Sequence, residues 1–135
     1  MLNKIFLIGR VGREPELRYG PSGKELCTFS VATTEYYKDK SGESKEKTEW
    51  HNIIAWGPTG KGCADHLSKG ALVFIEGKNT TNNWEDKSGN KRQTTQVQVI
   101  HMRKLADGKG GAPKPQEPAP NAPVGGQGAE EDVPF

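Results

Sequence analysis

Cysteine and long apolar runs are scarce in this sequence. Its only two cysteines, Cys27 and Cys63, are far apart and have no Cys-x-x-Cys spacing or neighbouring histidine pair. They therefore predict neither a disulfide framework nor a zinc site, and we interpret both as reduced core thiols. The apolar run Ile5–Ile8 is too short for a signal peptide, and no run approaches membrane-spanning length. These absences favour a cytosolic protein with no membrane partner.

Large apolar residues are also rare near the end of the chain. The 135 residues are 32% hydrophobic with a mean hydropathy of −0.80, which is low for one fully compact domain. After Leu105 the chain carries every proline except Pro15, Pro21 and Pro58. Such a segment buries too little surface to offset the entropy of ordering it. We expect a folded domain at 1–105, a disordered linker at 106–129 and an acidic tip at 130–135.

The charge of +2 hides an asymmetry between these parts. Residues 106–135 carry two lysines against five acidic residues, a net charge of −3. Residues 1–105 carry 17 basic against 12 acidic residues, a net charge of +5. This basic excess favours a polyanionic partner, although many domains reach it without binding nucleic acid.

Signatures of catalysis are missing. The stretch Gly57–Gly62 superficially suggests a phosphate loop, but Cys63 and Ala64 stand where that motif needs lysine and serine or threonine. Hydrolase, metalloprotease and deaminase signatures are absent too. The sequence predicts a protein that is not an enzyme and uses no cofactor or metal.

Residues 48–57 have the alternation of a central strand. Trp50 and Trp56 fall on one face, and His51, Ile53 and Ala55 fall on the other. The two indoles would lie roughly 20 Å apart at ~3.3 Å per residue, a span that suits a polymer better than a small ligand. The alternative is that both indoles are core residues, which their shared face makes less favourable.

The remaining pattern predicts an all-β protein. Five strands with one short helix between the third and fourth form the order of an OB fold, a barrel whose face and hairpin loops bind oligonucleotides. Gly70 would end the helix. We expect strands at 4–11, 26–34, 48–57, 71–79 and 94–102 and a helix at 59–69.

Two polar hairpin tips share the pattern aromatic-x-Asp-Lys-Ser-Gly. The first tip is expected at 38–47 and includes the copy that begins at Tyr37, while the second copy begins at Trp84. Each hairpin therefore carries an aromatic residue near a lysine. Asp-Lys-Ser-Gly is ordinary turn chemistry, which explains the repeated pattern better than a duplication does.

Four motifs resemble the bacterial-type single-stranded DNA-binding protein family. They are Pro15–Tyr19, Glu49–His51 with Trp56–Gly57, Phe74–Gly77 and Glu131–Phe135, and the resemblance covers the whole chain. It implies a homotetramer that binds single-stranded DNA in replication, recombination and repair. The aromatics that stack on DNA in that family match Tyr37, Trp50, Trp56 and Trp84. Position 37 is commonly tryptophan and position 56 commonly phenylalanine in the family.

Stacking on aromatics next to cations is a physical route to sequence-tolerant binding, because every base has a π face. An RNA-binding module of the cold-shock kind would share this chemistry, but it would not explain the acidic end. His51, on the opposite face from the indoles, is expected to be a core or subunit-interface residue. The cations nominated for phosphate contact, of which we expect roughly half to make it, are Arg10, Lys38, Lys40, Lys78, Lys87, Lys91 and Arg92.

The acidic tip is expected to dock other DNA-metabolism proteins. It holds the only aromatic residue after position 105, beside three consecutive acids. The resemblance assigns partner binding to this place and implies the bacterial cytosol and nucleoid, or the host cytosol for a viral protein. The tip consists of Glu130, Glu131, Asp132, Val133, Pro134 and Phe135.

Overall fold

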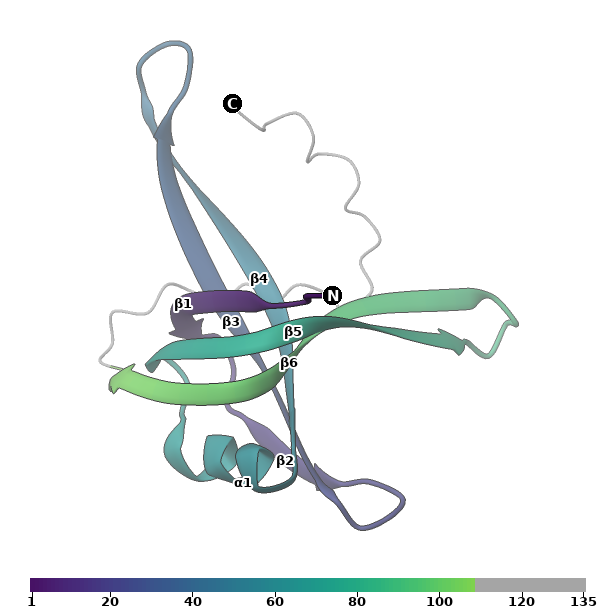
Figure 1. Cartoon of the computed structure of the whole chain (residues 1–135). Coiled ribbons are helices and arrows are strands. Elements are labelled where there is room, and N and C mark those ends of the chain that lie inside the picture. The colour runs from purple at the N-terminus through teal and green to yellow at the C-terminus, as the bar shows by residue number, and fades with distance from the viewer. Residues whose placement is uncertain (109–135) are drawn as a thin grey trace.

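Five long strands close into a barrel in the computed structural model, which describes residues 1–108 (Figure 1). The sheet order is β1-β5-β6-β4-β3-β2, and pairing of β1 with β3 closes the ring. The predicted OB-fold barrel is therefore confirmed. The elements are β1 (Ile5–Val11), β2 (Glu16–Tyr19), β3 (Glu25–Lys38), β4 (Ser44–Trp56), α1 (Gly57–His66), β5 (Leu72–Glu85) and β6 (Lys91–Ala106).

Barrel closure depends on a close approach at Gly9. Strands β1 and β3 pair through Arg10 with Ala32 and Val11 with Val31. A Cβ atom at position 9 would lie 2.2 Å from the carbonyl oxygen of Ala32, closer than any side chain allows. Glycine at this position lets the first strand reach the third, as expected where a strand turns a barrel corner.

The core lies on the predicted face of β4. Ile53 and Ala55 are buried, and His51 on the same face is half-buried. The thiols of Cys27 and Cys63 are free and fully buried, as predicted. Burial raises the pKa of Cys27 to about 11 and that of Cys63 to about 12, so both thiols stay protonated at neutral pH. The largest fully buried side chains are Phe29, Ile53, Ile75, Val11, Val31 and Val73.

Helix α1 lies between the third and fourth barrel strands, as predicted, but its bounds differ from 59–69. It begins at Gly57, with proline in its first turn, and ends at His66. The backbone N–H of Leu67 donates to the carbonyl of Cys63 and closes the last turn at 3.0 Å. A Cβ atom at Gly60 would lie 2.4 Å from the carbonyl oxygen of Ala55, so glycine allows the helix to lie directly against β4.

The bounds and number of the strands also differ from those expected. The first hairpin tip is shorter than 38–47, because β3 runs to Lys38 and β4 starts at Ser44. Strand β5 likewise extends to Glu85, and β6 already starts at Lys91. Both hairpins project from the barrel as two-stranded ribbons whose polar side chains carry no apolar alternation to reveal them (Figure 1). The short strand β2, which pairs with the start of β3, was not expected.

The two ribbon tips have the same turn, consistent with ordinary turn chemistry. Asp39 and Asp86 each accept backbone N–H bonds from the second and fourth residues that follow, all at 2.9 Å. Gly42 and Gly89 stand at positive φ angles of 84° and 87°. The pKa of each carboxyl is lowered, at Asp39 chiefly by a further hydrogen bond from the Ser41 hydroxyl and at Asp86 chiefly by the bond from the Asn90 N–H.

The expected tip at 130–135, and the expected linker beyond its first three residues, lie outside the described residues. Both therefore stay predictions.

Candidate nucleic-acid interface

Trp50 and Trp56 lie on one face of β4, opposite to the face that enters the core. Their cross-strand partners on β3 are Ala32 and Leu26, which share that face because directly opposed residues point the same way. Both indoles are half-buried. Neither ring is a core residue, and each keeps part of its surface open to a ligand.

The backbone at Gly12 supports the indole of Trp50. A Cβ atom on Gly12 would lie 2.3 Å from Cζ3 of Trp50 and 2.8 Å from Oγ of Ser30. The ring therefore lies directly over the bend that follows β1, and glycine is the residue that leaves room for it. No local sequence pattern reveals this contact, because Gly12 and Trp50 are far apart in the chain.

Replacing Gly12 with alanine should displace the Trp50 ring, because a Cβ atom does not fit beneath it. We expect a shift in the tryptophan emission of the free protein. The fluorescence spectrum of Gly12→Ala tests this. Gly62→Ala is the matched control, because nothing lies within 4 Å of a Cβ atom there. Equal effects of the two changes would contradict the support assigned to Gly12.

Trp56 lies under the amino group of Lys24. The Nζ atom is 5.8 Å from the ring centroid, a cation–π distance, and a Cβ atom at Gly20 would be 3.7 Å from the same indole. The β2–β3 hairpin thus borders this ring and places a cation on it. Lys24 was not among the nominated cations, since its approach to Trp56 depends on the hairpin formed by β2, a strand that was not expected.

Tyr37 is half-buried on the β3–β4 ribbon and belongs to the other face of that ribbon. Its cross-strand partner is Lys45, and Lys47 lies diagonally next to it, opposite Glu35. Neither lysine was nominated from the sequence. The pairing register of the hairpin could have revealed them, because a turn centred on Ser41 sets position 37 opposite position 45.

Trp84 lies near the end of the β5–β6 ribbon and is 40% exposed. Arg92 is its cross-strand partner, and the Nε of Arg92 donates to Asp86 at 3.0 Å. This ion pair ties the guanidinium to the turn at the end of the ribbon. The indole borders an open hollow of about 610 Å³ lined by Asn83, Trp84, Glu85, Lys91, Arg92 and Gln93.

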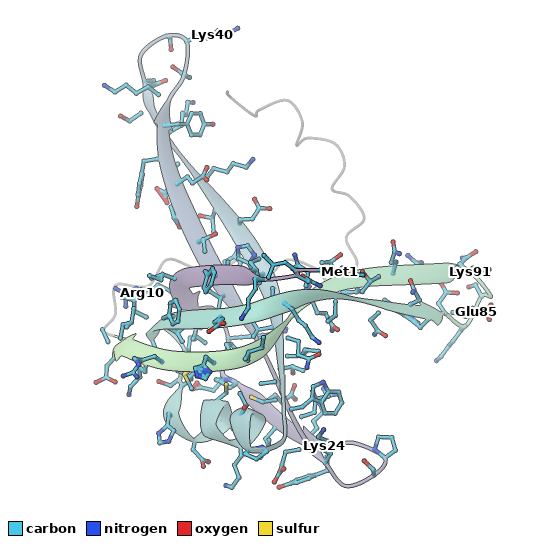
Figure 2. All side chains as sticks on the ribbon, viewed as in Figure 1. Met1, Arg10, Lys24, Lys40, Glu85 and Lys91 are labelled. Atoms are coloured by element: carbon cyan, nitrogen blue, oxygen red, sulfur yellow. The ribbon has the colours of Figure 1, made fainter. Side chains whose placement is uncertain are left out.

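The nominated cations are distributed over the molecule rather than gathered in one patch. Figure 2 shows Arg10, Lys40 and Lys91 at three separate extremities. Arg10 donates a hydrogen bond to the backbone carbonyl of Gly70 at 3.1 Å, so one of its N–H groups already has a partner within the protein. Within residues 1–108 the only nominated cation in an ion pair is Arg92, and those without one are Arg10, Lys38, Lys40, Lys78, Lys87 and Lys91.

His51 is a packed residue of the barrel. Its Nε2 lies 3.0 Å from the hydroxyl of Thr33, and burial lowers its pKa while nearby Glu49 opposes that shift. Among residues 1–108 no group of three or more histidine, cysteine or acidic residues could hold a metal ion. In the same part of the chain, no helix is both long and apolar enough to cross a membrane.

The architecture and the aromatic faces agree with a known family. The model of the single-strand binding protein family matches residues 2–105. The chain belongs to this family. The match includes the whole barrel and both ribbons, and therefore all four aromatics nominated for stacking.

Curated members of the family include close relatives. Single-stranded DNA-binding protein 1 of Chlorobaculum tepidum is 44% identical over 77% of this chain and 65% of its own length. The single-stranded DNA-binding protein of Neisseria meningitidis serogroup A is 41% identical over 83% of this chain and 66% of its own length. The chain thus spans slightly less than two thirds of the length of these relatives.

Solved members have the same fold. A Plasmodium falciparum protein, solved in complex with single-stranded DNA, is 34% identical with a TM-score of 0.70 and covers 78% of this chain and 96% of its own. A deletion mutant of the single-stranded DNA-binding protein of Thermus aquaticus is 32% identical with a TM-score of 0.68. That match covers 77% of this chain and 50% of the Thermus chain.

Proposed function

We propose that this protein binds single-stranded DNA without reading its sequence. The observation that carries the proposal is the pair of half-buried indoles, Trp50 and Trp56, on the outer face of β4. Membership of the single-strand binding protein family supports it, as does the DNA complex of the Plasmodium falciparum relative.

The mechanism follows from the chemistry of unpaired bases. Stacked indoles bind any base through its π face, and lysine and arginine side chains neutralise phosphates along the strand. Duplex DNA is rejected because its bases already stack on one another. The proposed contacts are the stacking residues Tyr37, Trp50, Trp56 and Trp84, with phosphate contacts from about half of the nominated cations.

Titration with oligo-dT tests this function. Binding should quench tryptophan fluorescence, duplex should bind far more weakly, and affinity should fall with salt with a log–log slope of about −0.7 per phosphate neutralised. Lys40→Ala and Lys87→Ala should flatten the slope modestly, while Lys61→Ala, on the helix, serves as the control. Equal affinity for duplex and single strands would reject the proposal.

The same titration separates DNA from RNA binding. Oligo-U presents the same stacking surface with 2′-hydroxyls, so preference for it would favour the cold-shock type of function instead. We further propose that the protein is not an enzyme. If the protein cleaved labelled DNA or hydrolysed nucleotides, and this activity changed in variants of the protein, the proposal that it is not an enzyme would be rejected.

The proposal includes a homotetramer. An exposed apolar surface supports association of subunits: Phe6 and Ile8 on β1 are 62% and 58% exposed, and the ring of Phe6 stacks on that of Phe74 at 6.3 Å between centroids. Exposed apolar patches of this kind commonly mark protein interfaces.

The biological setting is part of the same proposal. We propose that the protein protects single strands during replication, recombination and repair in the cytoplasm, in or near the nucleoid. Proteins of these processes would be recruited through residues 130–135, where Phe135 can fill an apolar pocket and the three acids can steer the encounter.

A further inference from the structure

The β3–β4 ribbon carries two adjacent tyrosines on opposite faces. Successive residues of a strand alternate between faces, and the register of this ribbon is unbroken from Leu26 opposite Trp56 to Lys38 opposite Ser44. Tyr36 therefore shares the face of Trp50, whereas Tyr37 does not. Tyr36 is 76% exposed, and its ring has no aromatic or cation–π partner within residues 1–108.

Small polar side chains lie between Tyr36 and Trp50 on this face. Tyr36 pairs with Glu46, four residues before Trp50 on β4, which corresponds to about 13 Å at ~3.3 Å per residue. Between them the hydroxyls of Thr34 and Thr48 lie 3.3 Å apart. Because these threonine side chains are small, the surface above them stays open, and one DNA strand could contact both the Trp50 indole and the Tyr36 ring.

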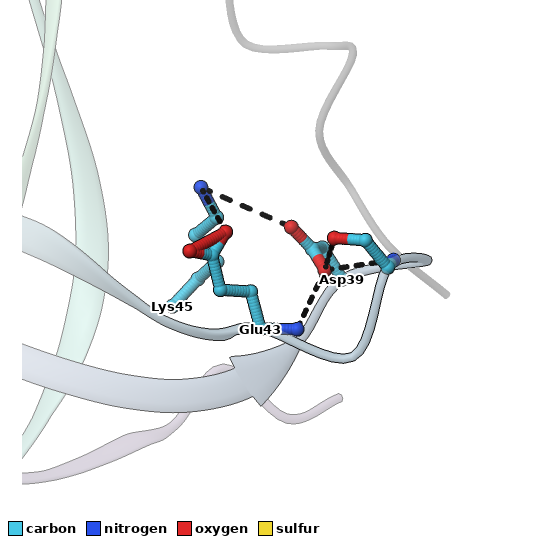
Figure 3. A network of polar contacts seen from close by, with 4 residues as sticks. Asp39, Glu43 and Lys45 are labelled. Atoms are coloured by element: carbon cyan, nitrogen blue, oxygen red, sulfur yellow. Dashed lines mark hydrogen bonds and ion pairs between the residues drawn. The ribbon is translucent and has the colours of Figure 1, made fainter.

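The turn at the tip of the ribbon is fixed by polar contacts. Asp39 accepts hydrogen bonds from Ser41 and Glu43, and Lys45 lies 3.9 Å from the carboxylates of both Asp39 and Glu43 (Figure 3). The turn fixes the pairing register, and the register fixes which tyrosine faces which way. The ribbon can therefore present Tyr36 and Tyr37 to different parts of a bound strand.

Charge contributes little net attraction on either face of the ribbon. On the face of Tyr36, the charge of Lys38 is balanced by that of Glu46. The face of Tyr37 carries two lysines and two glutamates, namely Lys45, Lys47, Glu35 and Glu49. An aromatic in a neutral environment holds a nucleic acid by stacking rather than by phosphate contact. Removal of such a residue lowers affinity without removing a phosphate contact, so the salt slope stays unchanged.

We propose that Tyr36 is a stacking residue for single-stranded DNA, extending the surface of Trp50 and Trp56 along one face of the β3–β4 ribbon. This inference rests on the proposed function and adds a contact to it. Tyr37 binds a different part of the strand on the other face, so the ribbon is contacted on both faces.

Titration of Tyr36→Ala with a long oligo-dT at several salt concentrations tests the inference. Affinity should fall by about 5- to 150-fold, the range expected for loss of one stacked base, with the log–log salt slope unchanged. Tyr36→Phe should keep parental affinity because it keeps the ring. Tyr19→Ala is the matched control, since Tyr19 is 65% exposed on β2 and pairs with Glu25, away from the face of the indoles.

The outcomes separate this inference from the function on which it rests. Parental affinity in Tyr36→Ala, with binding weakened in Trp50→Ala, would overturn the role of Tyr36 and leave the proposed function standing. A loss shared equally by Tyr36→Phe would also overturn it, because the hydroxyl and not the ring would then be responsible. If the parent protein itself did not bind oligo-dT, the proposed function would fail. Melting curves of all variants verify that the barrel is intact.

Discussion

Loss of both indoles, in the variant Trp50→Ala with Trp56→Ala, should reduce oligo-dT affinity by about 2–6 kcal/mol. The reason is that each ring offers a half-buried π surface on the same face of β4, and each stacked base contributes roughly 1–3 kcal/mol. The change should raise the dissociation rate more than it lowers the association rate, because the cations that attract the strand remain. Anisotropy of a labelled oligonucleotide measures the effect, since removal of the indoles alters intrinsic fluorescence.

The control for this prediction is the double variant Trp50→Phe with Trp56→Phe. It keeps an aromatic at each place and should retain most of the affinity. Packing must be checked separately, because Trp50 lies over Gly12 and Trp56 borders Gly20. A double alanine variant that stays folded and binds like the parent would place the stacking surface elsewhere.

The alternation of apolar and polar residues was the sequence signal that predicted the fold. It separated His51, Ile53 and Ala55 from the indoles, and burial of the two apolar residues confirms that separation. The same signal failed beyond the barrel. In the ribbons both faces are polar, so no apolar period marks where β3 ends or β5 continues, and backbone pairing alone extends them.

The site was less predictable than the fold, because its parts meet across the chain. Gly12 lies beneath Trp50 and Lys24 lies over Trp56, contacts between residues that no local pattern connects. Tyr36 was different. Its position on the face of Trp50 could have been read from the hairpin register once the turn at Asp39 was placed, but the family pattern directed attention to Tyr37.

The two ribbons differ in how they can hold a strand. On the β3–β4 ribbon, acids offset the lysines on both faces, so rings must supply most of the attraction. On the β5–β6 ribbon, Lys78, Lys87, Lys91 and Arg92 exceed Glu85 and Asp86 by two charges. Salt should therefore weaken contacts at Trp84 more than contacts at Tyr36.

Deletion of residues 130–135 should abolish capture of replication and repair proteins while leaving DNA binding intact. The deletion removes Phe135 and the three acids at 130–132. An aromatic side chain close to carboxylates suits an apolar pocket with a basic rim, and the acids would speed the encounter. None of the nominated stacking residues or cations lies in this segment.

The experiment compares the full chain, the deletion and Phe135→Ala as baits in a lysate of the source organism, with bound proteins identified by mass spectrometry. Both altered chains should lose the DNA-metabolism proteins that the full chain retains, whereas Gln127→Ala, outside the tip, should retain them. Affinity for oligo-dT should be equal or slightly higher after the deletion at low salt, because three acids no longer compete with DNA for the basic barrel. Capture undiminished in both altered chains would mean that partners dock elsewhere, and the barrel surface around Phe6 and Ile8 would be the next region to test.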